Sequence, residues 1–317
     1  MHRRQFLMSA AGGVALARMS ASTTAGAGTT LAARSLSAAS SADSAARPSA
    51  SDEREPQKDA AHPRVLKGRI HHSACRWCYG SIPLDDLCRA GAALGLKSIE
   101  LLDEKEWKVP AKYGLTCAMA NGPGPIHKGW NRVEHHDELV KASERMLPLA
   151  KDAGLPNMIV FSGNRAGISD ADGIRNCVAG LKRVTPLAEK LGLTLCLELL
   201  NSRVDHHDYQ CDRTDWGVEV CKAVGSPRLK LLFDIYHVQI MEGDIIRRIR
   251  DNVAFIGHFH TGGVPGRHEI DDDQELHWRT IAQAIADLKF EGYFAHEFVP
   301  VRDPITSLKE AFVRCSV

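Results

Sequence analysis

The segment AEKLGLTLCLELL, from Ala188 to Leu200, places a helix-like stretch, a glycine and a short apolar run in direct succession. Glycine favours the left-handed conformation that ends many helices, because it has no Cβ atom to clash there. The run that follows is continuously apolar rather than alternating, which is typical of a parallel strand buried on both faces. This segment therefore predicts the end of a helix followed by a buried parallel strand.

The same succession recurs along the chain. It is found in AALGLKSIELL (92–102), AKYGLTCAMA (111–120), KDAGLPNMIVF (151–161), KAVGSPRLKLLFD (222–234) and LKFEGYFAHEF (288–298). Together with KGRIHHSAC (67–75) and NVAFIGHFH (252–260), these runs predict eight strands centred near Ile70, Ile99, Cys117, Ile159, Leu197, Leu232, Ile256 and Ala295. Eight strand-then-helix units in roughly 250 residues describe an α/β protein with a (β/α)8 TIM barrel. A doubly wound sheet is the weaker alternative, because no G-x-G-x-x-G motif follows any of the runs.

The first part of the chain does not have the composition of a folded domain. Arg3-Arg4 precede a short apolar stretch, the pattern of a twin-arginine export signal, which we assign to residues 1–30. Residues 31–62 are rich in alanine and serine and are expected to be a flexible leader. A single barrel domain is then expected over residues 63–317. The protein is predicted to be periplasmic without a membrane anchor, because the apolar stretch is too short to span a bilayer.

Charge and cysteine content narrow the class of protein further. After the first fifty residues the chain carries 35 basic and 38 acidic side chains, so we expect no nucleic-acid partner. The nine cysteines are scattered and odd in number, and no disulfide framework is expected. Cys75-Arg-Trp-Cys78 has the spacing of a zinc or redox motif. A lone C-x-x-C is a weak signal, however, and packing is the preferred interpretation.

Four ionisable residues lie at or near the ends of four consecutive predicted strands: Glu198, Asp234, His260 and Glu297. Each is about one strand–helix unit from the next, and the carboxyl ends of the strands carry the chemistry of a TIM barrel. Burying three carboxylates together is costly unless a cation neutralises them. We therefore predict one divalent metal ion held by three carboxylates and one imidazole. The alternative is that each carboxylate pairs separately with an arginine or lysine at the rim.

Further residues are expected around the mouth of the barrel, the opening at the carboxyl ends of the strands. We expect four of them to bind substrate oxygens: Asn201, His237, Arg267 and Glu269. In GHFHTGGVPGRHEID (257–271), the glycine turn is expected to bring Arg267 back over the mouth. His258 should lie one layer deeper than His260 as a hydrogen-bonded packing residue, because residues two apart on a strand share a face. A phosphate cradle in this loop is disfavoured, because Pro265 supplies no N–H to an anion.

Four segments resemble hydroxypyruvate isomerases, within the larger xylose-isomerase-like group of TIM barrels that includes ketose 3-epimerases and endonuclease IV. They are LELLNSR (197–203), FDIYHVQIMEGD (233–244), GHFHTGGVPGRHEI (257–270) and GYFAHEF (292–298). The resemblance covers most of residues 66–300 and is tightest from Leu193 onward. It implies that the four residues at the strand ends bind the metal ion, and that Glu198 and Glu297 are also the acid–base pair.

The chain departs from this family at two places. Many hydroxypyruvate isomerases have glutamine where this chain has His260, whereas epimerase relatives have histidine. The loop VDHHDYQCD (204–212) also lacks the usual proline-glycine-tyrosine pattern. These departures concern the substrate rather than the type of reaction.

Chemistry and resemblance together predict a metal-dependent isomerase of a small α-hydroxy-carbonyl compound. One divalent ion, Mn, Co, Zn or Mg, would polarise the carbonyl, and the two glutamates would move a proton through an enediolate. A ketose 3-epimerase acting on a free sugar is an alternative that uses the same residues. An endonuclease would need a basic surface, and a periplasmic solute-binding protein would need two lobes. A small-molecule substrate is the only expected partner, and a homo-oligomer is compatible with the sequence.

Overall fold

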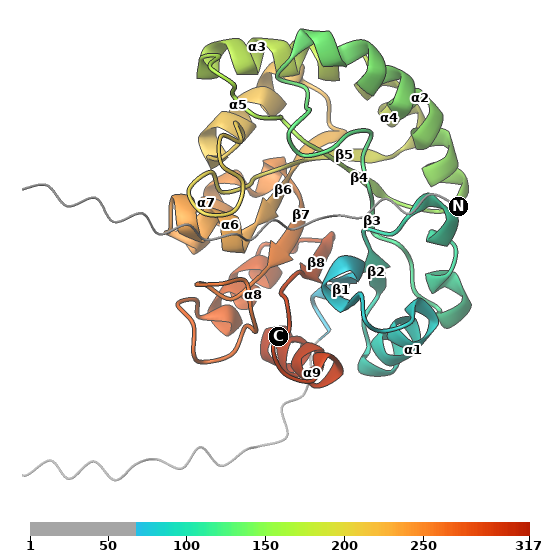
Figure 1. Ribbon diagram of the computed structural model, residues 1–317. Helices are drawn as coiled ribbons and strands as arrows, with labels where there is room; N and C mark the ends of the chain where they lie inside the picture. Colours follow the sequence, from blue (N-terminus) through green and yellow to red (C-terminus); the bar gives the residue numbers. More distant parts are fainter. Residues whose placement is uncertain (1–67) are drawn as a thin grey trace, which may run out of the picture. The chain divides into compact units, whose positions relative to one another are not determined.

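The computed structural model describes residues 68–317, which form eight strands and the helices between them (Figure 1). The strands are β1 (His71–Cys75), β2 (Ser98–Glu100), β3 (Met119–Ala120), β4 (Asn157–Val160), β5 (Thr194–Glu198), β6 (Leu229–Asp234), β7 (Ile256–Thr261) and β8 (Tyr293–His296). The α-helices are α1 (Leu84–Leu94), α2 (His136–Asp152), α3 (Asp170–Leu181), α4 (Thr185–Leu191), α5 (Thr214–Val224), α6 (Ile235–Met241), α7 (Ile245–Asn252), α8 (Trp278–Asp287) and α9 (Pro304–Cys315). The predicted export signal (1–30) and leader (31–62) lie outside the described residues.

The strands form one parallel sheet that nearly closes on itself. Its order is β2-β1-β8-β7-β6-β5-β4-β3, and each neighbouring pair is parallel. The two end strands meet through isolated parallel bridges, Ser98 with Thr116 and Leu102 with Ala120. The helices lie around the outside of the strands (Figure 1). The predicted (β/α)8 TIM barrel is confirmed.

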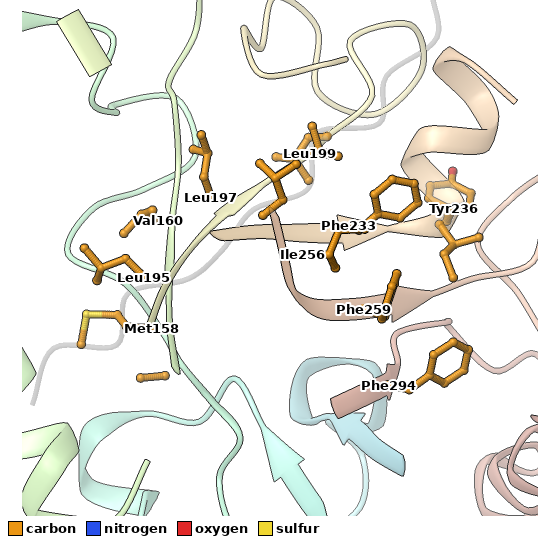
Figure 2. Close-up of a cluster of buried hydrophobic side chains, with 14 of the residues drawn as sticks. Met158, Val160, Leu195, Leu197, Leu199, Phe233, Tyr236, Ile256, Phe259 and Phe294 are labelled. Atoms are coloured by element: carbon orange, nitrogen blue, oxygen red, sulfur yellow. The ribbon is translucent and has the colours of Figure 1, made fainter. Parts of the chain in front are cut away.

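Side chains along the strands alternate between two apolar layers. The larger layer packs strand residues against helix residues such as Cys177 and Leu181. Its strand residues, seen in Figure 2, include Met158, Val160, Leu195, Leu197, Phe233, Phe259 and Phe294. The smaller layer consists of Met119, Ile159, Cys196 and Leu232, inside the barrel. Residues two apart on a strand share a face, so Glu198 and Asp234 also point into the barrel.

Glycine ends helices in this fold, as the sequence predicts. Gly192 ends α4 with φ of 72°, and its N–H donates to the carbonyl oxygens of Ala188 and Glu189. The connection from β2 to β3 differs from expectation: it contains the 3-10 helices η2 (Glu104–Glu106) and η3 (Pro110–Tyr113) instead of an α-helix. Within residues 68–317, none of the helices combines the length and apolar character needed to cross a membrane.

Candidate active site

The structure brings the four residues from the strand ends into one buried cluster. Glu198 ends β5, Asp234 ends β6, His260 lies on β7, and Glu297 directly follows β8. Each offers one ligand atom, and these atoms all lie within 4.8 Å of one another. The parallel register explains the convergence, because Asp234 pairs directly with His260 across β6 and β7. The cluster therefore follows from the fold.

Arg267 reaches the same cluster from the loop after β7, as the sequence predicts. Its Nη2 donates to Asp234 Oδ2 at 2.6 Å and also to Glu297 Oε2, while its Nε donates to the Glu297 carbonyl oxygen at 3.1 Å. The glycine turn shapes this return: Gly263 N donates to the His268 carbonyl oxygen at 2.9 Å, and Arg267 N donates to the Gly263 carbonyl oxygen at 2.8 Å. Arg267 therefore neutralises two of the three carboxylates.

Replacing Gly263 with alanine should destabilise the protein by about 1–3 kcal/mol, the usual cost of forcing atoms into a packed site. A Cβ atom at this position would lie 2.3 Å from the carbonyl oxygen of Glu269 and 2.9 Å from that of His268. Urea unfolding measures the change. Gly80→Ala is the matched control, because a Cβ there meets only the Trp77 carbonyl oxygen at 3.7 Å. Equal stability of the two variants would contradict the close approach that returns Arg267 to the cluster.

His237 and Asn201 extend the site beyond Arg267. His237 Nε2 lies 2.6 Å from Arg267 Nη1, and its Nδ1 lies 2.6 Å from Asn201 Nδ2. Burial and the neighbouring Arg267 cation hold the pKa of His237 well below its usual range. A neutral imidazole can accept the hydrogen bond from Arg267. The structure thus places both residues in a polar chain that leads to the carboxylates.

Glu269, predicted to bind substrate, does not join this cluster. Its Oε1 accepts hydrogen bonds from the backbone N–H groups of Val301 and Arg302, each at 3.0 Å, and from Ser307 Oγ at 2.8 Å. These contacts tie the loop after β7 to the loop after β8 and to the start of α9. The contacts of Glu269 thus anchor two loops, and its predicted role in binding substrate stays a prediction.

Trp77 also belongs to the site, although its sequence position did not predict this. Its Nε1 donates to Glu297 Oε1 at 2.7 Å, while 50% of the residue remains exposed. Arg267 lies over its ring, 5.8 Å from the centroid. Trp77 belongs to the 3-10 helix η1 (Arg76–Tyr79), a turn that carries no periodic signal from which its direction could be read.

Glu100 is a second residue beside the site that the sequence pattern did not predict. It ends β2 and is fully buried, with Oε1 2.8 Å from His258 Nε2 and 3.0 Å from His260 Nε2. Burial alone would raise the pKa of Glu100, but hydrogen bonds and charge from His258 and His260 lower it to about 2. The expected deeper, hydrogen-bonded position of His258 agrees with this contact. A charged residue inside the apolar run SIELL is the signal that could have identified Glu100.

The C-x-x-C motif does not lie on a single strand. Cys75 ends β1, whereas Cys78 lies in η1, and all nine cysteines are unpaired within the described residues. Burial raises the pKa of both thiols well above the usual range. Uncharged buried thiols act as small packing groups, which agrees with the preferred interpretation.

Burial makes it costly to ionise the carboxyl groups of the cluster. Burial raises the pKa of Glu198 to about 7 and that of Asp234 to about 6. Burial also acts on Glu297, but His260 and Arg267 hold its pKa well below the usual range. The ionised form of Glu198 is the least stabilised of the three, because its nearest cationic partner in the cluster is His260 Nδ1 at 3.6 Å. A further cation would favour the ionised form of all three carboxylates.

The donor set fits a divalent metal ion. His260 Nδ1 is buried and faces the carboxylates, 2.6 Å from Glu297 Oε2 and 3.6 Å from Glu198 Oε1. A ring nitrogen in this position can direct a lone pair into the cluster. Three carboxylate oxygens and one imidazole nitrogen suit Mn, Co, Zn or Mg. The residues that would hold the ion are Glu198, Asp234, His260 and Glu297.

An eight-stranded parallel barrel with a carboxylate-rich cluster at the carboxyl ends of its strands defines a TIM-barrel protein with the architecture of an enzyme. Residues 89–312 match the model of the xylose isomerase-like TIM barrel family, and the chain belongs to this family.

Among proteins of similar sequence, the 2-oxo-tetronate isomerase of Cupriavidus necator is 38% identical over 109 residues, which cover 34% of this chain and 41% of that protein. A Danio rerio protein with the provisional name hydroxypyruvate isomerase is 32% identical over 123 residues, covering 39% of this chain and 45% of its own. The chain thus matches less than half the length of these two relatives.

Two crystal structures have the same fold. AP endonuclease, family 2, from Brucella melitensis superposes with a TM-score of 0.68 at 21% identity, covering 75% of this chain and 97% of its own. D-psicose 3-epimerase in the presence of D-fructose superposes with a TM-score of 0.61 at 20% identity. The superposition covers 76% of this chain and 90% of the epimerase chain. At this level of identity the likeness establishes the barrel alone.

Proposed function

We propose that this protein is a metal-dependent isomerase of a small α-hydroxy-carbonyl compound, with an activity like that of hydroxypyruvate isomerases. The observation that carries the proposal is the convergence of three carboxylates and one imidazole from four consecutive strands, with ligand atoms within 4.8 Å of one another. The relatives named as isomerases support the class of reaction. A chelated protein that catalyses as well as the metal-loaded protein would contradict the proposal.

In this proposal Glu198 and Glu297 move the proton, and their contacts support these roles. Glu297 is held by Trp77 on one oxygen and by Arg267 on the other, so its orientation is restrained. Glu198 lies on the other side of His260, on β5, and can serve as the partner group. One glutamate, ionised beforehand, removes the proton from the hydroxyl-bearing carbon beside the carbonyl, and the other, protonated beforehand, gives its proton to the former carbonyl carbon. The hydroxyl proton moves to the former carbonyl oxygen, so the substrate gains and loses no atoms. The two roles require that both carboxyl groups face the bound substrate.

The remaining residues of the site bind the metal ion and orient the substrate. A divalent ion held by the four residues would polarise the carbonyl group and offset the buried negative charge. Arg267 contributes a cation that lies between the carboxylates and His237, where it can bind a substrate oxygen. His237, whose pKa burial and the Arg267 cation hold low, accepts the hydrogen bond from Arg267 Nη1 and so restrains the guanidinium group.

A ketose 3-epimerase is the second candidate, because His260 stands where epimerase relatives have histidine. Epimerisation would use the same two glutamates, with the proton returned to the opposite face of the same carbon. Product analysis separates the two reactions. In isomerisation the carbonyl group moves to the next carbon, whereas in epimerisation it stays and one hydroxyl group is inverted.

Replacing Trp77 with phenylalanine should lower kcat by about tenfold with little change in KM, because hydrogen bonds to charged groups contribute about 1.5–3 kcal/mol. Phenylalanine keeps an aromatic ring but removes the N–H that holds Glu297 Oε1. Steady-state kinetics at saturating metal measure the effect. Val301→Ala, at an exposed position of the loop after β8, is the control. An unchanged kcat in Trp77→Phe would show that this hydrogen bond does not orient Glu297.

Export to the periplasm by the twin-arginine pathway is part of the proposal and rests on Arg3-Arg4 and the apolar stretch after them. Changing both arginines to lysine should retain the protein inside the cell, because the pathway recognises the arginine pair. Fractionation followed by immunoblotting compares the two forms. Normal levels of the double variant in the periplasm would overturn the assignment.

A further inference from the structure

A second polar cluster lies inside the barrel, beside the proposed metal site. Its centre is Glu100, which accepts a hydrogen bond from Ser73 Oγ on Oε2 at 2.6 Å. Its other oxygen, Oε1, contacts Nε2 of both His258 and His260. All four residues are 0% exposed. A buried carboxylate is tolerated when it is hydrogen-bonded in this way. Here one hydroxyl group and two imidazoles serve the carboxylate, and the Cys75 thiol also donates to Oε1 at the longer distance of 3.9 Å.

The two ring nitrogens of His260 face different partners. Nε2 lies 3.0 Å from Glu100 Oε1, whereas Nδ1 faces Glu297 and Glu198 at 2.6 and 3.6 Å. Cys75 Sγ is also near Nε2, but at 3.7 Å it is the more distant group. In the neutral ring that a metal ion requires, a carboxylate that accepts from Nε2 keeps the proton on that nitrogen, which leaves the lone pair on Nδ1.

We propose that Glu100 is a positioning residue for the metal site: it holds the proton on His260 Nε2 and the plane of the ring, so that Nδ1 is the metal-binding atom. This inference rests on the proposed metal-binding function. Ser73 and His258 hold Glu100 in turn, because each donates to a different oxygen of its carboxylate. A hydrogen bond from Nε2–H to an anion also makes Nδ1 more basic and therefore a stronger metal ligand.

A different use of the same atoms is a second metal ion, bound by Glu100, His258 and His260, whose ligand atoms also lie within 4.8 Å of one another. The separations of 2.8 and 3.0 Å between Glu100 Oε1 and the two Nε2 atoms are those of ordinary N–H···O hydrogen bonds. Direct hydrogen bonding accounts for this cluster without an ion. The two alternatives predict different metal stoichiometries.

The test uses the zinc-loaded, full-length protein labelled with 15N at histidine. The wild-type protein should bind one ion, and NMR should show a proton coupled to His260 Nε2 and the metal-dependent shift on Nδ1. Glu100→Gln should lower zinc affinity by about 10- to 100-fold, the usual effect of losing such an outer partner. Glu269→Gln is the matched control, because Glu269 is also buried but contacts loop residues, and its zinc affinity should not change.

Several results would overturn the inference. These are zinc on His260 Nε2, two bound ions per chain, or equal zinc affinity in Glu100→Gln and the wild type. If Glu100→Gln does not fold, the NMR spectrum of the wild-type protein still decides which nitrogen carries the proton. A wild-type protein that binds no zinc or manganese would contradict the proposed function itself. Tight binding of one ion together with an unaffected variant would contradict only the role of Glu100.

Discussion

Replacing Glu198 with glutamine should lower turnover by about 10²- to 10⁴-fold while leaving the fold and the bound metal in place. This is the usual contribution of a group that transfers a proton in the transition state. Glutamine has the same shape and can still offer an oxygen to an ion, but it cannot exchange a proton efficiently. The contact of Glu198 within the cluster is His260 Nδ1 at 3.6 Å, so the amide replaces the carboxylate without leaving strong hydrogen bonds unmade.

Glu297→Gln should cause a loss of similar size, but its interpretation is less direct. Both Glu297 oxygens accept hydrogen bonds, from Trp77 and Arg267, so an amide NH₂ would face a donor in either orientation. Turnover is measured by NMR of the product, and metal content and circular dichroism are measured on the same samples. Glu269→Gln serves as the control. Wild-type turnover in both Glu198→Gln and Glu297→Gln would end the assignment of the proton-transfer pair.

The second large effect is expected at His260. Replacement by alanine should lower the affinity for Mn, Co or Zn by more than about hundredfold, since loss of an outer hydrogen-bond partner alone costs about 10- to 100-fold. Alanine removes the one nitrogen donor of the set. Isothermal titration calorimetry with each ion measures the loss.

His260→Gln is the informative companion to this variant. The amide oxygen restores a ligand but removes the nitrogen donor, so the preference should move toward Mg, which suits oxygen ligands. The two variants thus separate loss of a ligand from change of its chemistry. Unchanged affinity in His260→Ala, or no change of metal preference in His260→Gln, would contradict the proposed donor set.

The barrel and the main cluster could be predicted because both follow from local patterns. Continuous apolar runs after glycine indicate parallel strands, and parallel strands carry their carboxyl ends to one edge of the sheet. Correct assignment of the strands is therefore enough to predict that the four residues at the strand ends lie together: Glu198, Asp234, His260 and Glu297. Their convergence required no knowledge of loops.

The contacts of Glu100, Trp77 and Glu269 could not be predicted, because they depend on tertiary geometry that the sequence pattern does not contain. Glu100 and His260 lie on β2 and β7, which are not neighbours in the sheet and meet only across the barrel interior. Trp77 and Glu269 lie in turns and loops, where side-chain direction is set by tertiary contacts rather than by a repeat. For Glu269 those contacts are with the loop after β8 and with Ser307 at the start of α9.

The measurement that tests the central claim most directly is solvent deuterium exchange. Metal-loaded protein is incubated in D₂O with a panel of small hydroxy ketones, ketoses and hydroxy keto acids, and each compound is followed by NMR and mass spectrometry. We expect deuterium on a carbon beside the carbonyl group of at least one compound, with exchange lost on chelation of the metal and in Glu198→Gln. Exchange that proceeds equally well in the chelated protein and in Glu198→Gln, or no exchange in any compound by fully metal-loaded protein, would contradict a metal-dependent proton-transfer enzyme.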